Sequence, residues 1–193
     1  VLNLFARMFK DEKDMSDRIY YTSKQVLQDY LAPITNYLTQ FGKLFDLKKM
    51  PLHIEFRMDD KGAIVPIEVN PLRFAGAGTT ELGDFAYGVN PYDYFFDQRK
   101  PNWPLLIERM DNQIYSFTCA EFDGEIKIDE GYVVRHDLLK KQFHHILEYR
   151  HIPYDSGTTF AVIFFSSDSL AQNEHILSLD FMAFVEEKTS VLL

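Results

Sequence analysis

Two acidic residues and an amide lie close together in a stretch of the sequence whose other residues are mostly apolar. The stretch LHIEFRMDDKGAIVPIEVNP covers residues 52–71 and contains Glu55, Glu68 and Asn70. Carboxylate and amide oxygens are the ligands that a hard divalent cation such as Mg²⁺ prefers. The two carboxylates could instead share a proton in acid–base chemistry, or they could form salt bridges with the basic residues nearby. Those basic residues are Arg57, Lys61 and Arg73. The residue types alone leave these three alternatives open.

The alternation of apolar and polar residues predicts that this stretch is a β-hairpin. If the segment DDKG forms the turn, Ile54 lies opposite Ile67 and the apolar faces of the two strands match. In this register Glu55 and Glu68 are diagonal neighbours on one face, roughly 7–8 Å apart at Cα. Asn70 projects from the same face. The pattern therefore predicts that all three polar side chains share one face of the hairpin.

The remaining elements follow from hydrophobic periodicity. A helix is expected after Thr22 as N-cap, because apolar residues recur every three or four positions from Leu27 to Phe45. Pro33 should kink this helix or divide it. Further elements are expected as strands at 114–122, 145–152 and 158–165, and as a final amphipathic helix at 169–187, capped by Asp168 and Ser169. Mixed strands and helices predict an α/β or α+β fold.

Composition and charge exclude several classes of function. The 193 residues carry a formal net charge of −9, whereas general binding to nucleic acids or anionic membranes needs a basic surface. No apolar run approaches the roughly 20 residues of a membrane-spanning helix, and the first residues do not predict a secretory signal. The single cysteine, Cys119, fits a reducing compartment. We therefore expect a cytoplasmic protein. The opening VLNLFARMF resembles the end of a buried strand, so we expect the chain to begin inside a longer protein.

The segments HIEFR and GAIVPIEVNPLRFAG resemble the C-terminal signature of ATP-grasp enzymes. In that family, an acid on one strand is followed by Glu-x-Asn on the next strand, and these residues hold the Mg²⁺ ions on ATP. Glu55, Glu68 and Asn70 match this pattern, with 13 positions separating the two acids. The resemblance implies the C-terminal portion of an ATP-grasp fold, a mostly antiparallel sheet flanked by helices. Residues 1–97 would be the part of the ATP-grasp domain that carries the metal-binding hairpin. Residues 98–193 would be a C-terminal α/β extension packed on it.

The resemblance also implies roles for the residues of the hairpin. Glu68 would bridge two Mg²⁺ ions, while Glu55 and Asn70 would each hold one, and Mn²⁺ could replace Mg²⁺. Ile67, beside Glu68, would contact the adenine of ATP.

Two arginines are the candidates for a catalytic role. Arg73 would bind the substrate carboxylate or an acylphosphate, because a planar guanidinium suits both anions. Many family members carry a basic residue two positions after the asparagine, whereas Arg73 stands three positions after Asn70. Arg57 is a second candidate, with a plain salt bridge as an equal alternative.

The function implied by the resemblance is a Mg-ATP-dependent ligase that forms an acylphosphate from a small carboxylate substrate. The alternatives are a non-catalytic ATP-grasp-like binding module and an ATP-grasp kinase. The expected partners are ATP, the carboxylate substrate and an upstream ATP-grasp region that supplies the residues gripping the nucleotide. Without that region, the chain alone is expected to be inactive. A homodimer is compatible with this expectation.

Overall fold

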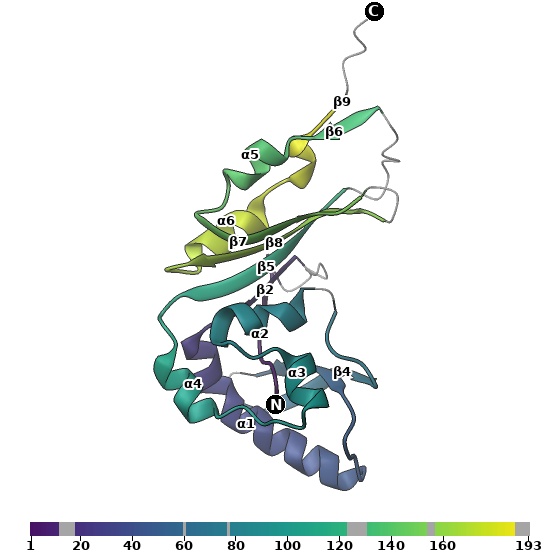
Figure 1. The fold of residues 1–193 in the computed structure, drawn as a ribbon, viewed down its shortest axis with the longest axis vertical. Helices are drawn as coiled ribbons and strands as arrows, with labels where there is room; N and C mark the ends of the chain where they lie inside the picture. The colour runs from purple at the N-terminus through teal and green to yellow at the C-terminus, as the bar shows by residue number, and fades with distance from the viewer. Residues whose placement is uncertain (12–17, 60, 77, 123–130, 154–156, 188–193) are drawn as a thin grey trace, which may run out of the picture. The chain divides into compact units, whose positions relative to one another are not determined.

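The computed structural model describes residues 1–11, 18–59, 61–76, 78–122, 131–153 and 157–187, and Figure 1 shows their helices and strands. The chain forms two compact units, which are described one by one. The first unit comprises Val1–Phe5 and Thr22–Asp111, and the second comprises Ala6–Tyr21 and Asn112–Leu193. The division into domains 1–97 and 98–193 stays a prediction.

The first unit combines helices with one hairpin. Its elements are α1 (Lys24–Leu44), β3 (Leu52–Met58), β4 (Ile64–Pro71), α2 (Thr79–Tyr87), α3 (Pro91–Phe96) and α4 (Trp103–Arg109). Helix α1 runs unbroken through Pro33, so the proline does not divide it. The N-cap is Ser23 rather than Thr22, and the Ser23 hydroxyl accepts a hydrogen bond from the backbone N–H of Val26 at 3.2 Å. The Thr22 hydroxyl instead donates to the carbonyl of Leu4 at 2.8 Å, because Thr22 still belongs to the preceding strand.

A hydrogen-bonded junction connects the first residues of the chain to α2. Asn3 Nδ2 donates to the carbonyl of Thr79 at 2.7 Å, and the Asn3 side-chain oxygen accepts from the hydroxyl of buried Tyr87. Burial raises the pKa of Tyr87, so its hydroxyl stays protonated and can donate. A Cβ at Gly83 would stand 2.9 Å from the Tyr87 hydroxyl and 3.0 Å from Asn3 Oδ1. Glycine therefore permits the close approach that fixes the first turns of α2.

The second unit is built on a five-stranded sheet with the strand order β1-β2-β5-β8-β7. These strands are β1 (Ala6–Met8), β2 (Ile19–Thr22), β5 (Ile114–Glu121), β8 (Thr159–Ser167) and β7 (His145–His151). The other elements are β6 (Tyr132–Val134), α5 (His136–Lys140), α6 (Ala171–Ser178), the 3-10 helix η2 (Phe181–Phe184) and β9 (Val185–Glu187). Strand β8 pairs antiparallel with β5 and β7 and is buried from Phe160 to Ser167. It forms the centre of the core together with α6 and η2.

The prediction of one long final helix over residues 169–187 is wrong in its second half. Helix α6 ends at Ser178 and is followed by η2 and β9. Asp180 starts η2 by accepting a hydrogen bond from the backbone N–H of Met182 at 2.9 Å. Phe181 and Phe184 are buried in the core. Asp168 and Ser169 do not cap α6, because its N-cap is Leu170.

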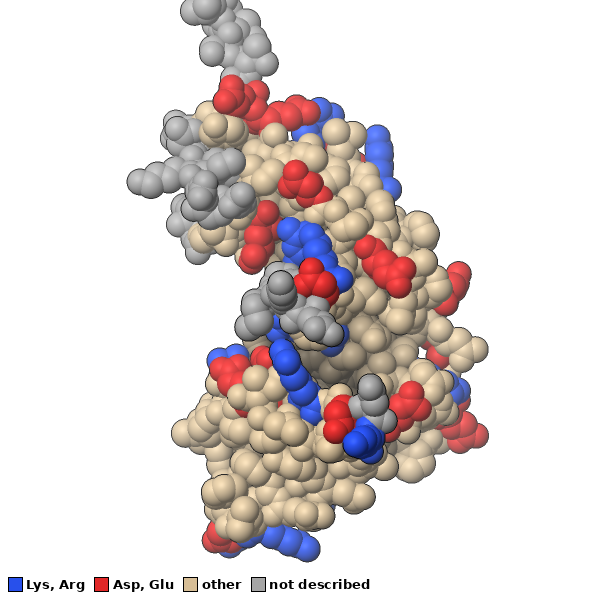
Figure 2. All heavy atoms as spheres, turned by 180° about the vertical axis from the view of Figure 1, so that it is seen from behind, with Lys and Arg blue, Asp and Glu red and all other residues tan. Residues whose placement is uncertain are grey.

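Charged side chains of both signs are interspersed on the face shown in Figure 2. The end of the first unit that carries α1 shows a wide area with few charged side chains in the same view. Several large apolar side chains of this unit are exposed, among them Leu44 at 77%, Phe45 at 57% and Leu72 at 76%. Within the described residues, no helix is both long enough and apolar enough to cross a membrane.

His136 at the start of α5 lies among aromatic and basic side chains. Its Nδ1 is 2.6 Å from the hydroxyl of Tyr149, and its ring centroid is 4.1 Å from that of His151. Burial, together with the positive charges of His151 and Lys140, lowers the pKa of His136 from 6.5 to about 4. The folded chain therefore favours the neutral ring.

We expect the free energy of unfolding to decrease as the pH falls from 6.5 toward about 4. In this window the unfolded chain takes up a proton at His136 before the folded chain does, so the stabilisation present above pH 6.5 is lost. The substitution His136→Gln should reduce this pH dependence by on the order of 1 kcal/mol, less than the full pKa shift implies, because the ring is partly exposed. Urea unfolding of both proteins across the window measures the difference. His175→Gln is the matched control, and an unchanged slope in the His136 variant would contradict the prediction.

Candidate functional site

The β3–β4 hairpin is a two-stranded antiparallel sheet of its own. Glu55 lies directly opposite Glu68, and Ile54 lies opposite Val69. The predicted register, which placed Ile54 opposite Ile67 and the two acids on a diagonal, is therefore wrong. Directly opposed residues of an antiparallel pair are about 4.5–5.5 Å apart at Cα. The two carboxylates thus lie closer together than the sequence pattern predicted.

A longer turn accounts for the first part of this shift. Met58 pairs with Ile64, and the backbone N–H of Asp59 donates to the carbonyl of Ala63 at 3.1 Å. The Asp59 carboxylate accepts a hydrogen bond from the backbone N–H of Ala63 at 2.8 Å. The turn therefore extends to Ala63, one residue beyond the predicted segment DDKG. Asp60 within this turn lies outside the described residues. Such local hydrogen bonds of an aspartate are a common way to close a turn.

A β-bulge accounts for the rest of the shift. The register changes between Glu55 and Phe56, whose partners are Glu68 and Pro66, so Ile67 has no pairing residue. A bulge of this kind bends a strand and redirects its side chains. The Ile67 side chain is 57% exposed, as are Val65 at 58% and Val69 at 39% in the same strand. An apolar side chain is thereby presented next to the acidic pair.

The acidic face of the hairpin carries four polar side chains. Glu55 and Glu68 are opposed, and so are His53 and Asn70. Opposed residues share a face, as do residues two positions apart on a strand, so all four project from the same side. The structure therefore brings Glu55, Glu68 and Asn70 together on one face.

His53 is the member of this face that the sequence analysis missed. Its Nδ1 lies 3.5 Å from Asn70 Nδ2. Burial lowers the pKa of His53 from 6.5, an effect that Glu55 and Glu68 oppose and Arg73 reinforces. The neutral ring can accept a hydrogen bond from the Asn70 amide group, which leaves the amide oxygen of Asn70 for a cation. The only signal in the sequence was the position of His53 two residues before Glu55.

The two candidate arginines differ in their surroundings. The charge of Arg73 acts on His53, and its Nε donates to the carbonyl of Phe74 at 3.3 Å. Arg57 is exposed and lies opposite Val65. In the described part of the chain, neither arginine forms an ion pair with Glu55 or Glu68. The salt-bridge alternative for the two acids is therefore not found there.

The donor set of the acidic face fits a hard divalent cation. Two opposed carboxylates and an amide oxygen are typical ligands of Mg²⁺, which usually takes one or two carboxylates and completes its coordination with water and substrate phosphates. Over the residues that the structure describes, no group of three or more His, Cys, Asp or Glu side chains could hold a metal ion. The hairpin therefore offers part of a coordination sphere rather than a closed metal site.

Comparison with known proteins agrees with the sequence resemblance. A family model described as "ATP-grasp domain" matches residues 1–81. Among solved structures, phosphoribosylglycinamide synthetase from Anaerococcus prevotii is similar with a TM-score of 0.60 at 11% sequence identity, over 95% of this chain and 48% of the other. L-amino acid ligase from Bacillus licheniformis is similar with a TM-score of 0.60 at 16% identity, over 93% of this chain and 47% of the other. No curated protein matches the chain in sequence.

These findings confirm the resemblance to ATP-grasp proteins and the predicted mixed α/β fold with mostly antiparallel strands. The family match covers the hairpin, including Glu55, Glu68 and Asn70. The chain spans about half the length of the solved structures that it matches.

The opposed carboxylates predict an effect on stability. Glu68→Gln should raise the free energy of unfolding by about 0.5 kcal/mol at low ionic strength without divalent cations, because it removes the repulsion between opposed like charges. The gain should shrink in high salt, which screens the repulsion. Urea unfolding in the presence of a chelator measures it, with Glu108→Gln on exposed α4 as control. A loss of stability in the Glu68 variant, or a gain that salt does not change, would contradict the prediction.

Proposed function

We propose that the β3–β4 hairpin is the metal- and phosphate-binding part of an ATP-dependent ligase of the ATP-grasp type. The observation that carries this proposal is the direct opposition of Glu55 and Glu68, with Asn70 on the same face. The match of residues 1–81 to the ATP-grasp domain supports it, and so does the likeness to two solved ligases. The proposed compartment is the cytoplasm.

In this proposal, Glu55, Glu68 and Asn70 would hold the Mg²⁺ ions of Mg-ATP, with Glu68 as the ligand shared by two ions. Mg²⁺, or Mn²⁺ in its place, would supply the positive charge that neutralises the β- and γ-phosphate oxygens. Neutral His53 would orient the amide of Asn70 and leave its oxygen available to a cation. The exposed side chain of Ile67 offers an apolar contact for the adenine.

The proposed reaction joins a small carboxylate to an amine or a thiol. A carboxylate oxygen of the substrate attacks the γ-phosphorus of ATP, and the bond to the β-phosphate oxygen breaks, which yields an acylphosphate and ADP. The nitrogen or sulfur of the second substrate then attacks the acyl carbon and displaces inorganic phosphate. Arg73 is the first candidate to bind the substrate carboxylate and the acylphosphate, since a guanidinium forms paired hydrogen bonds with both anions. Arg57 is the second candidate.

The proposed active protein includes an upstream ATP-grasp region. The solved ligases are about twice as long as this chain. By the family resemblance, the residues that grip the nucleotide would precede the metal-binding acids. The chain alone is therefore expected to lack turnover.

In a protein that includes the upstream region, Glu68→Gln should abolish Mg²⁺-dependent binding of ATP, because an amide cannot replace a bridging carboxylate. Isothermal titration calorimetry with and without Mg²⁺ measures the effect, and Glu108→Gln is the control. Unchanged affinity in the Glu68 variant would contradict the metal assignment. If the wild type itself binds no ATP, the hairpin belongs to a non-catalytic relative.

The dependence of ADP release on a second, nucleophilic substrate should distinguish a ligase from a kinase. A ligase of this kind releases ADP in steady state only when the carboxylate and a nucleophilic second substrate are both present. A coupled ADP assay with a panel of small carboxylates, with and without amines or thiols, measures this dependence. Steady ADP release with a phosphorylated carboxylate as the final product would instead identify a kinase.

A further inference from the structure

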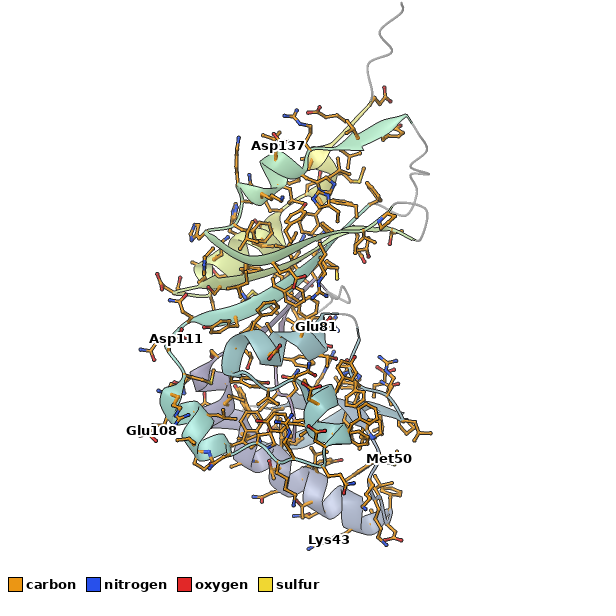
Figure 3. All side chains as sticks on the ribbon, viewed as in Figure 1. Lys43, Met50, Glu81, Glu108, Asp111 and Asp137 are labelled. Atoms are coloured by element: carbon orange, nitrogen blue, oxygen red, sulfur yellow. The ribbon has the colours of Figure 1, made fainter. Side chains whose placement is uncertain are left out.

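Aromatic rings gather where the chain leaves the hairpin. Phe74 follows the end of β4, and its ring packs on rings of α3, whose side chains lie beside it in Figure 3. The ring centroid of Phe74 is 4.5 Å from that of Tyr92 and 5.5 Å from that of Phe95. The ring of Phe96 lies 6.5 Å from Phe74 and 5.4 Å from Phe95 between centroids. We call these four residues the aromatic cluster.

The aromatic cluster is held by packing and still open to a ligand. Phe74 and Phe95 are half-buried, whereas Phe96 is 72% exposed and Tyr92 is 41% exposed. Exposed aromatic surface is unfavourable in water, and a contiguous patch of it is typical of a binding site. The exposed rings therefore offer an apolar surface at the end of the hairpin.

A cation lies directly beside the aromatic cluster in the chain. Arg73 is exposed, and its Nε donates to the carbonyl of Phe74 at 3.3 Å, which keeps the guanidinium close to the backbone of that residue. Among the described residues, no carboxylate forms an ion pair with Arg73. Its Nη1 and Nη2 can therefore donate a pair of hydrogen bonds to the carboxylate of a ligand.

A strained turn connects these residues to the acidic face. Leu72 has a φ of 60°, an outlier for a bulky residue, and its backbone N–H donates to the carbonyl of Pro51 at 3.0 Å. The Leu72 side chain is 76% exposed, so burial in the first unit does not account for the strain. Strained residues of this kind cluster at binding sites. Only Pro71 and Leu72 separate Asn70 of the acidic face from Arg73.

We propose that Arg73 and the aromatic cluster bind a small carboxylic acid that carries an aromatic ring. The inference rests on the proposed function, because this acid is the substrate class of the proposed reaction. Arg73 holds the carboxylate, and the ring packs on Tyr92 and Phe96. Asp93 on α3 repels a carboxylate, so the ring rather than the carboxylate lies toward α3. Aromatic rings gain from edge-to-face or offset contact beyond the apolar area that they bury, which favours an aromatic over a saturated ring.

The first test is a titration of the isotope-labelled 193-residue chain with 3-phenylpropionate, followed through the amide resonances of Phe74 and Phe96 in NMR spectra. We expect saturable shifts with a dissociation constant on the order of millimolar, as is usual for so small a ligand. Propionate lacks the ring and 3-phenyl-1-propanol lacks the carboxylate, so each should bind at least fivefold more weakly. 3-Cyclohexylpropionate should bind at least twofold more weakly, because its ring is saturated.

The absence of saturation would overturn the proposal, and so would equal binding of any of these three comparison compounds. AMP also combines an anion with an aromatic ring. Saturation of the same resonances by AMP at lower concentrations than by 3-phenylpropionate would overturn the proposal in favour of a nucleotide.

Variants of exposed residues locate the two contacts. Arg73→Gln should weaken the binding of 3-phenylpropionate at least fivefold and leave that of 3-phenyl-1-propanol unchanged, whereas Phe96→Ala should weaken both. Lys43→Gln is the control for charge, on α1 where Figure 3 labels Lys43, and Phe45→Ala removes a ring that is 57% exposed at the end of α1. Equal weakening by a variant and its control would overturn the proposal.

A second measurement separates this inference from the proposed function. Binding of 3-phenylpropionate to the 193-residue chain requires neither ATP nor Mg²⁺, so it supports the binding site even if the longer protein binds no Mg-ATP. In that longer protein, with hydroxylamine as the nucleophile, kcat/KM for ADP release should be at least tenfold higher with 3-phenylpropionate than with propionate. A preference for propionate would support the ligase and overturn the substrate class inferred from Arg73 and the aromatic cluster.

Discussion

The orientation of the acidic face depends on one aromatic contact. Tyr37 of α1 meets Phe56 of β3 edge to face, with ring centroids 5.3 Å apart and an interplanar angle of 81°. A two-stranded hairpin is marginally stable in water by itself, so β3 and β4 need a partner surface. Phe56 directly follows Glu55, and successive side chains of a strand point to opposite faces. Packing Phe56 on α1 therefore turns Glu55, and with it the opposed Glu68, away from the helix.

In the described part of the chain, no cationic side chain forms an ion pair with Glu55 or Glu68. Histidine could neutralise part of the charge if it were protonated, but burial lowers the pKa of His53 despite the two carboxylates nearby. The hairpin therefore holds opposed like charges beside a neutral ring, which is unfavourable for the free chain. A cation that binds the folded hairpin and not the unfolded chain recovers this free energy as stability. In the proposed function, the repulsion that weakens the hairpin alone favours the binding of a divalent cation between Glu55 and Glu68.

The sequence predicts long, strongly periodic elements well. The apolar repeat from Leu27 onward predicts α1, and the runs around residues 114–122 and 158–165 predict β5 and β8. Short elements are decided by caps and by packing instead. Asn102 caps α4 through its side chain, so a helix begins within the segment QRKPNWP, residues 98–104, whose two prolines are typical of a connection. Asp180 and the burial of two phenylalanines likewise divide what the pattern joined into one final helix.

The residues of the candidate site show the same limit of the sequence pattern. Alternation has a period of two, so it predicts that Glu68 and Asn70 share a face of β4, but whether Glu55 lies on that face depends on the register, because a shift by one residue exchanges the two faces. The extra loop residue and the bulge at Ile67 each shift the pairing by one residue, and only together do they place Glu55 on the face of Glu68 and Asn70. Packing decides where a bulge forms and which side chains it redirects, and packing is what the sequence pattern does not contain.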